Sequence, residues 1–225
     1  MQVAALDIGR AHCQVGEETY LTYKRSDING KNVMTSKIDE QTMPLTGKRQ
    51  TIVEAATLVF ARYGFARTSM ADLSEAVGMS RTALYPFFRN KGDVFDAVIR
   101  HATAKTVVAI RNGLALHTTL EAKLRFACVD WIVHGYEFVH AMPDASDQFD
   151  LKVPAVRDTY GAMETLLVDI LAPYAADASI DIVLIARTAT ASFRSFKDFA
   201  VNTDELRRMI DTQINLLVDR LECRQ

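Results

Sequence analysis

The stretch TSMADLSEAVGMSRTALYPFFRNKGDVF, residues 68–95, decides how this chain folds. Gly78 interrupts an otherwise helical pattern, and a second helical segment begins almost at once. Because glycine readily adopts a backbone conformation that side chains resist, Gly78 predicts a tight turn between two short helices. Ser69 and Ser80 stand where these helices begin, and their hydroxyls suit N-cap positions. The stretch therefore predicts a helix-turn-helix unit over residues 69–88.

Helical periodicity continues on both sides of this unit. Upstream, apolar residues recur at helical spacing until Gly64 ends the run; they are Ile52, Val53, Ala56, Val59, Phe60 and Tyr63. Downstream, Asn90 can cap a helix that continues beyond Thr106, and further helices are expected over about 120–140, 154–171, 180–200 and from 203 onwards. No segment shows the alternation of apolar and polar residues that is typical of a β-strand. The sequence predicts an all-α protein, with an N-terminal three-helix head and a C-terminal helical bundle.

The chain divides into three parts by pattern and by charge. Residues 1–44 show no sustained period and are expected to be disordered, and the natural translation start could be Met1, Met34 or Met43. Residues 45–105 form the predicted head and residues 106–225 the body. Residues 47–105 hold 9 Lys and Arg against 5 Asp and Glu, a charge of 9 − 5 = +4, and residues 106–225 hold 12 against 17, or 12 − 17 = −5. This asymmetry favours a head that binds a polyanion.

Several functional classes are disfavoured by what the sequence lacks. Its 3 cysteines are far apart and have no zinc-site spacing, which is typical of free thiols in a reducing cytoplasm. No apolar run approaches the length of a membrane span. There is no nucleotide-binding loop and no nucleophile motif, so no cofactor and no enzymatic activity are expected.

The second helix of the unit carries residues suited to contacting DNA. Arg81 and Thr82 lie in its N-terminal half, where a recognition helix meets base edges, and arginine can donate two hydrogen bonds to guanine. Tyr85, one turn further on, can reach a phosphate with its hydroxyl. Lys91 and Ser69 stand at helix N-termini, where the helix dipole attracts phosphate. Two more residues complete the expected DNA-binding set, Ser80 at the start of the second helix and Lys48 near a possible minor-groove arm.

At these residues the sequence resembles the TetR family of transcriptional regulators. The resemblance covers about residues 46–105 and includes the preceding segment RQTIVEAATLVFARYGF. It implies a homodimer that binds a double-stranded DNA operator, a C-terminal domain that binds a small-molecule effector, and dimerisation through about 180–221. Two departures stand out: Ala83 replaces a threonine that often contacts phosphate in the family, and Pro86 falls inside the recognition helix. Proline removes a backbone N–H, so a kink or an early helix end is expected at Pro86.

The body offers candidates for a ligand pocket between its helices. They are Cys128, Trp131, Phe138, Tyr160 and Met163. A metal site formed by Asp130, His134 and Glu137 is an alternative use of the same region, since the three are spaced along one helix face. The opposite face is apolar, so these polar residues are interpreted as the solvated side of an amphipathic helix, and no metal is expected.

The last two helices carry broad apolar stripes that are interpreted as a dimer interface. On the final helix the stripe consists of Leu206, Ile210, Ile214, Leu217 and Leu221, with Met209 and Leu216 beside it. The other interpretation is that both stripes close only the chain's own core.

The function expected from these features is that of a ligand-responsive regulator, a repressor that binds a palindromic operator as a homodimer. A DNA-binding regulator without an effector and a helical-bundle enzyme are the alternatives.

Overall fold

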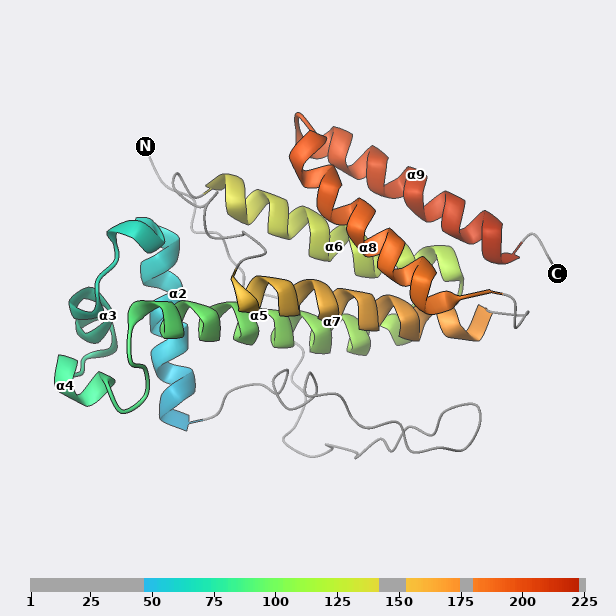
Figure 1. Cartoon of the computed structure of the whole chain (residues 1–225). Helices are drawn as coiled ribbons and strands as arrows, with labels where there is room; N and C mark the ends of the chain where they lie inside the picture. The colour runs from blue at the N-terminus through green and yellow to red at the C-terminus, as the bar shows by residue number, and fades with distance from the viewer. Residues whose placement is uncertain (1–46, 142–152, 175–179, 223–225) are drawn as a thin grey trace. The chain divides into compact units, whose positions relative to one another are not determined.

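The computed structural model describes residues 47–141, 153–174 and 180–222, apart from the side chains of residues 138–141. The disorder expected for residues 1–44 lies outside these ranges. The elements in chain order are α2 (Gly47–Arg67), α3 (Met70–Val77), α4 (Arg81–Leu84), α5 (Lys91–Gly113), η1 (Leu114–Leu116), α6 (Leu120–Ala141), α7 (Pro154–Leu171), η3 (Ala172–Tyr174), α8 (Ile182–Phe199) and α9 (Thr203–Glu222) (Figure 1). Every element of the described residues is helical, which confirms the all-α prediction.

The predicted helix boundaries of the head are confirmed by their caps. Ser69 accepts a hydrogen bond from the Asp72 N–H and forms a capping box, and Ser80 accepts one from Ala83. Gly78 ends α3 with φ 71° and ψ 32°, the left-handed conformation that glycine was expected to adopt. Asn90 caps α5 in the same way as the two serines.

A compact apolar core holds the head together. It is built from α2, α3, α4 and the first half of α5, and its fully buried members include Ile52, Val53, Ala56, Leu73, Leu84 and Val94. Phe60, Phe65 and Phe95 add an aromatic cluster with ring centroids 5.0–6.0 Å apart. Tyr63 is exposed, contrary to its expected place in the apolar stripe. Gly64, the next residue, breaks the regular helix with φ 74° and ψ 166°.

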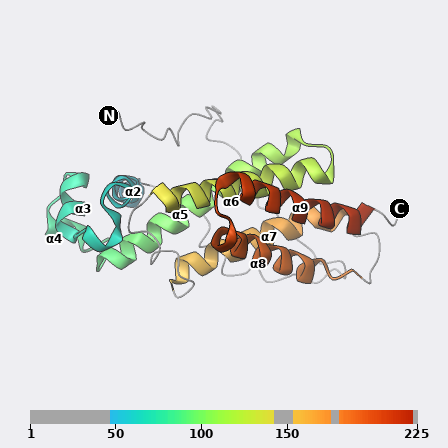
Figure 2. The ribbon, with the colours of Figure 1, turned by 90° about the horizontal axis from the view of Figure 1, so that it is seen from above.

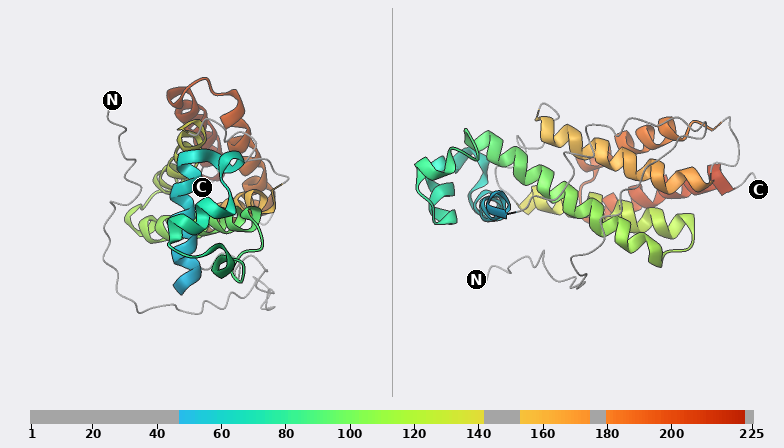
Figure 3. Two further views of the ribbon diagram at one scale, coloured as in Figure 1. Left: turned by 90° about the vertical axis from the view of Figure 1, so that its left-hand side faces the viewer. Right: turned by 90° about the horizontal axis from the view of Figure 1, so that it is seen from below.

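Helix α5 continues from the head core into the body, where it lies beside α7 (Figures 1 and 3). Val94 and Val98 near its start belong to the head core, and Ile110 near its end belongs to the body core. Polar contacts join α5 to α7 along their length. They are the ion pairs Arg100–Asp158 and Arg111–Asp169 and the hydrogen bond between the hydroxyls of Thr103 and Thr159.

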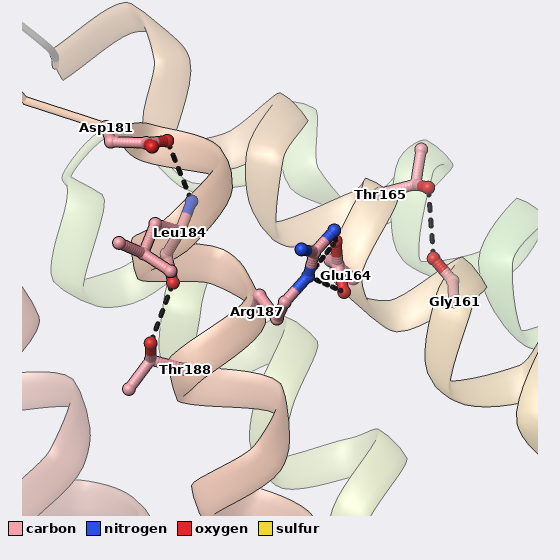
Figure 4. Close-up of polar contacts among 7 residues, drawn as sticks. All are labelled: Gly161, Glu164, Thr165, Asp181, Leu184, Arg187 and Thr188. Atoms are coloured by element: carbon pink, nitrogen blue, oxygen red, sulfur yellow. Dashed lines mark hydrogen bonds and ion pairs between the residues drawn. The ribbon is translucent and has the colours of Figure 1, made fainter.

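The remaining helices complete the body. Helix α8 packs on α7, α9 packs on α6, and α8 and α9 lie next to each other (Figure 2). Asp181 caps the start of α8 by accepting a hydrogen bond from the Leu184 N–H, and Arg187 forms an ion pair with Glu164 of α7 (Figure 4). None of the described helices combines the length and apolar character that a membrane span needs.

The structure corrects the expected role of the stripe on the last helix. Its five members, Leu206, Ile210, Ile214, Leu217 and Leu221, are all buried in the core of this one chain. Leu216, which was placed beside the stripe, is 60% exposed and faces outwards. The stripe therefore closes the body of the chain itself, which was the alternative interpretation of the pattern.

A charge on the buried stripe should consequently unfold the body. Ile214→Asp places a carboxylate at a position with 0% exposure, and we expect a loss of several kcal/mol in the free energy of unfolding. Val108→Asp, at an exposed apolar position of α5 outside the stripe, should change stability by less than about 0.5 kcal/mol. Thermal denaturation followed by circular dichroism compares the two variants. Equal melting temperatures would contradict the assignment of Ile214 to the core.

Candidate nucleic-acid interface

The recognition helix α4 is a single turn, Arg81–Leu84, and Tyr85 is its C-cap residue. The early end expected from Pro86 is thereby confirmed, since the turn stops two residues before the proline. The N–H groups of Phe87 and Phe88 both donate to the Leu84 carbonyl, at 3.0 and 3.2 Å, so the chain still turns without continuing the helix. Leu84 and Phe88 are buried and anchor this segment to the head core.

The outward side of α4 presents four of the predicted DNA-binding residues. Ser80, Arg81, Thr82 and Tyr85 are all exposed. The Arg81 Nε–H donates to the Tyr85 hydroxyl at 3.1 Å, and the guanidinium lies 5.7 Å from the tyrosine ring centroid. This contact orients the arginine and leaves its terminal nitrogens for an acceptor. Ser80 accepts from the Ala83 N–H, so its own hydroxyl hydrogen remains available to a phosphate.

The hydroxyl of Ser69 is engaged in the cap of α3. Its backbone N–H and its hydroxyl both donate to the Asp72 carboxylate, each at 2.8 Å. These two bonds, the backbone one first, lower the pKa of Asp72. A phosphate at the Ser69 hydroxyl would have to displace this carboxylate, and in this structure the hydroxyl serves the helix cap.

The ammonium of Lys91 is engaged within the head. Its ammonium donates to the carbonyls of Phe65, Ala66 and Thr68, at 2.9, 3.1 and 3.0 Å, and lies 4.5 Å from the Phe65 ring centroid. A lysine has three N–H donors, and all three are used here. The side chain therefore ties the end of α2 to the start of α5 instead of projecting toward a phosphate.

Two arginines that sequence reasoning left out of the site extend the basic surface beside α4. Arg49 donates to the Phe87 carbonyl at 3.1 Å and lies 4.4 Å from the Phe88 ring centroid, so it holds the segment that follows Pro86. Arg89 forms an ion pair with Asp93. Both line a groove of about 450 Å³ that Tyr85 also borders. Lys48, from the predicted set, is exposed at the start of α2. In the sequence, Arg49 stands next to Lys48 near the possible minor-groove arm, and Arg89 counts as general surface charge that can steer phosphate.

The predicted pocket residues of the body differ in how far they are buried. Cys128 and Met163 are buried, and burial raises the pKa of the Cys128 thiol, which disfavours a reactive thiolate. Trp131 and Tyr160 are partly buried, and the side chain of Phe138 lies outside the described part of the structure. The other polar set, Asp130, His134 and Glu137, is exposed on α6, as its interpretation as a solvated face predicted.

A capped helix, a left-handed glycine turn and a short second helix with an outward arginine define the head as a helix-turn-helix domain. Residues 52–98 match the family model described as "Bacterial regulatory proteins, tetR family". An HTH-type transcriptional repressor of Mycobacterium tuberculosis is 32% identical over 106 residues, which are 46% of this chain and 55% of that protein. The chain thus spans about half the length of this curated relative.

Solved structures extend the likeness to the body. A transcriptional regulator from Cytophaga hutchinsonii superposes with a TM-score of 0.65 at 17% identity, over 78% of this chain and 99% of its own. The regulator FadR from Bacillus subtilis, in complex with stearoyl-CoA, superposes with a TM-score of 0.59 at 16% identity, over 76% of this chain and 98% of its own. The chain therefore carries the helix-turn-helix domain of the TetR family on a body with the fold of such regulators, which confirms the resemblance seen in the sequence.

The contribution of Lys91 to the stability of the head can be measured. Lys91→Ala removes three charge-assisted hydrogen bonds to backbone carbonyls, and we expect the free energy of unfolding to fall by about 1–3 kcal/mol. Lys48→Ala is the matched control, because Lys48 is exposed and its loss should leave stability unchanged. Urea denaturation of both variants compares them. A Lys91→Ala variant as stable as the parent would return Lys91 to the DNA-contacting set.

Proposed function

We propose that this chain is a ligand-responsive transcriptional repressor, which binds a palindromic operator as a homodimer and releases it when an effector occupies the body. The observation that carries the proposal is the exposed set on α4, where Arg81 is oriented by Tyr85 at the surface of a TetR-family head. The repressor name of the Mycobacterium tuberculosis relative supports the direction of regulation.

The DNA contacts follow from the positions of the side chains. Arg81, at the first position of α4, can offer its terminal nitrogens to O6 and N7 of a guanine in the major groove. Thr82 can reach a neighbouring base or phosphate, while the hydroxyls of Ser80 and Tyr85 can bond to the sugar-phosphate backbone of the DNA. Lys48 supplies charge at the start of α2. Two such heads must lie about one helical turn of DNA apart, or a small multiple of it.

The outer faces of α8 and α9 are the surfaces we assign to the dimer, in place of the buried stripe. Leu184 is 57% exposed and Leu216 is 60% exposed. Between such apolar residues the hydroxyls of Thr188, Ser192 and Thr212 donate to carbonyls of their own helices, at 2.8–3.1 Å. A hydroxyl satisfied within its own helix can be buried against a second copy without an unpaired donor. These faces can therefore pack as a four-helix interface.

The effector would act through the body, where Trp131 packs against the core and Tyr160 is partly buried. The complex of Bacillus subtilis FadR with stearoyl-CoA is a precedent for ligand binding by a protein of this fold. An effector can weaken DNA binding only if it has different affinities for the DNA-bound and released states of the dimer. The proposal is tested by salt-dependent binding of the purified chain to the DNA upstream of its own gene; absence of such binding contradicts it.

The base-reading role of Arg81 leads to a specific expectation. Arg81→Ala should weaken operator binding by about 1–3 kcal/mol and relax the preference at one base position of each half-site. Arg89→Ala, which removes an arginine bonded to Asp93 beside the site, should weaken binding to all sequences equally. Binding to a panel of single-base operator variants distinguishes the two. Identical specificity profiles for both variants would remove Arg81 from base readout.

The proposed dimer surface is tested with charges on the exposed face. Leu184→Asp combined with Leu216→Asp should leave the chain folded, because both positions are exposed, and should give monomers that bind the operator weakly. Sedimentation velocity measures the oligomeric state, and Val108→Asp, an exposed apolar position on α5, is the control. A double variant that remains dimeric would place the interface elsewhere.

A further inference from the structure

Lys197 is a partly buried lysine whose ammonium lies between helices of the body. It lies on α8, and its ammonium approaches α6 so closely that a Cβ placed on Gly135 would be 3.0 Å from Nζ. On the other side the ammonium lies 5.8 Å from the ring centroid of Tyr160 on α7. Gly135 therefore provides the space that this side chain occupies between three helices.

The ammonium is not neutralised there. Burial lowers the pKa of Lys197 to about 8, and the negative charge of the neighbouring Asp198 only partly opposes this effect. Arg194 and Asp198 of α8 also act on Tyr160, whose pKa is raised mainly by burial. In the described part of the chain no carboxylate forms an ion pair with Lys197. A partly buried cation that faces an aromatic ring but forms no ion pair with a described carboxylate can accept an anionic partner.

A second unpaired polar group lies on the same face of α8. Thr190 precedes Lys197 by seven residues, which is two helical turns or about 10 Å. Its hydroxyl is buried and has no hydrogen-bond partner. Phe193, which lies between the two along the helix, is buried in the body core. The inner face of α8 thus combines one unpaired cation, one unpaired hydroxyl and an aromatic side chain.

We propose that Lys197 is the residue that recognises the effector, and that the effector is an apolar monocarboxylate whose acid group pairs with the ammonium. The inference rests on the proposed function, because it names the ligand class of the effector site in the body. A carboxylate supplies the missing counter-charge, and an apolar remainder suits the side chains around Phe193. The Thr190 hydroxyl offers a further hydrogen bond inside the body.

The turn of α7 that contains Tyr160 links this site to the head. Tyr160 directly follows Asp158 and Thr159, and these two residues bond to Arg100 and Thr103 of α5. A carboxylate that draws Lys197 away from the Tyr160 ring would act on the turn that holds α5. Because α5 belongs to the head core as well, the ligand would reach the DNA-binding surface through one helix.

The test uses the full chain, with decanoate as the probe and decanamide, its neutral analogue, as the comparison. The single tryptophan, Trp131, lies one turn before Gly135 on α6, so its fluorescence reports binding. We expect decanoate to bind at least about tenfold more tightly than decanamide, which is the effect of one charge-assisted hydrogen bond. Its affinity should fall about tenfold or more between pH 7 and pH 9.5, because the ammonium loses its proton above about pH 8.

Substitutions of Lys197 separate recognition from folding. Lys197→Met should abolish the preference for decanoate while the melting temperature stays equal or rises, because a buried charge is removed. Lys197→Arg should keep decanoate binding at pH 9.5, since a guanidinium stays protonated. Arg187→Met, which removes an exposed arginine of the same helix, should behave like the parent. Equal binding of decanoate and decanamide by the parent, or unchanged decanoate binding by Lys197→Met, overturns the inference.

Gel-shift measurements with the upstream DNA, on the same samples, keep this inference separate from the proposed function. A chain that binds the DNA but shows no preference for decanoate overturns the inference and leaves the proposed function standing. A chain that binds decanoate through Lys197 but binds no DNA supports the carboxylate site and overturns the proposed function. Release of the DNA by decanoate in the parent, but not in Lys197→Met, supports both.

Discussion

Helix α5 imposes the constraint on which the rest of the structure depends, because one continuous helix belongs to two hydrophobic cores. Its 23 residues span about 35 Å at 1.5 Å per residue, and their apolar side chains are divided between the head and the body. A packed core does not deform smoothly, so a displacement of α5 in the body has to be accommodated at its other end. Lys91 makes that end rigid, since it bonds the first turn of α5 to the last turn of α2.

Polar contacts between α5 and α7 add to the apolar packing of these two helices in the body core. Three polar contacts, Arg100–Asp158, Thr103–Thr159 and Arg111–Asp169, are spread along the pair. Partly exposed ion pairs and hydroxyl contacts contribute little stability individually, and they can exchange partners with water at small cost. Helix α7 also supplies Leu166 and Ile170 to the body core that contains Ile110 of α5, so the two helices are held by apolar packing and by this polar seam together.

The local features of the head could be predicted from the sequence because their causes are local. Ser69, Ser80 and Asn90 cap the helices that follow them, Gly78 makes the turn, and Pro86 ends the recognition helix early. The stripe around Ile214 was assigned to a dimer because apolar periodicity identifies a buried face but not the chain that buries it. Lys91 and Ser69 were assigned to DNA because a helix N-terminus attracts an anion, whereas their donors are used within the head. Lys197 was missed because a lysine beside arginine, serine and aspartate looks like surface, and only the packing of three helices buries it.

The shortness of α4 limits how much sequence information one head can extract from DNA. Four helical residues extend about 6 Å, which is less than two base-pair steps at 3.4 Å each. The regular helix ends at Leu84, and only a turn through Tyr85 to Phe87 follows it. A bacterial genome offers on the order of 10⁶ or more competing positions, far more than so few bases can distinguish. In the proposed dimer, the missing discrimination comes from the spacing between the two heads and from the shape and flexibility of the DNA between them, so the early helix end before Pro86 makes DNA mechanics part of recognition.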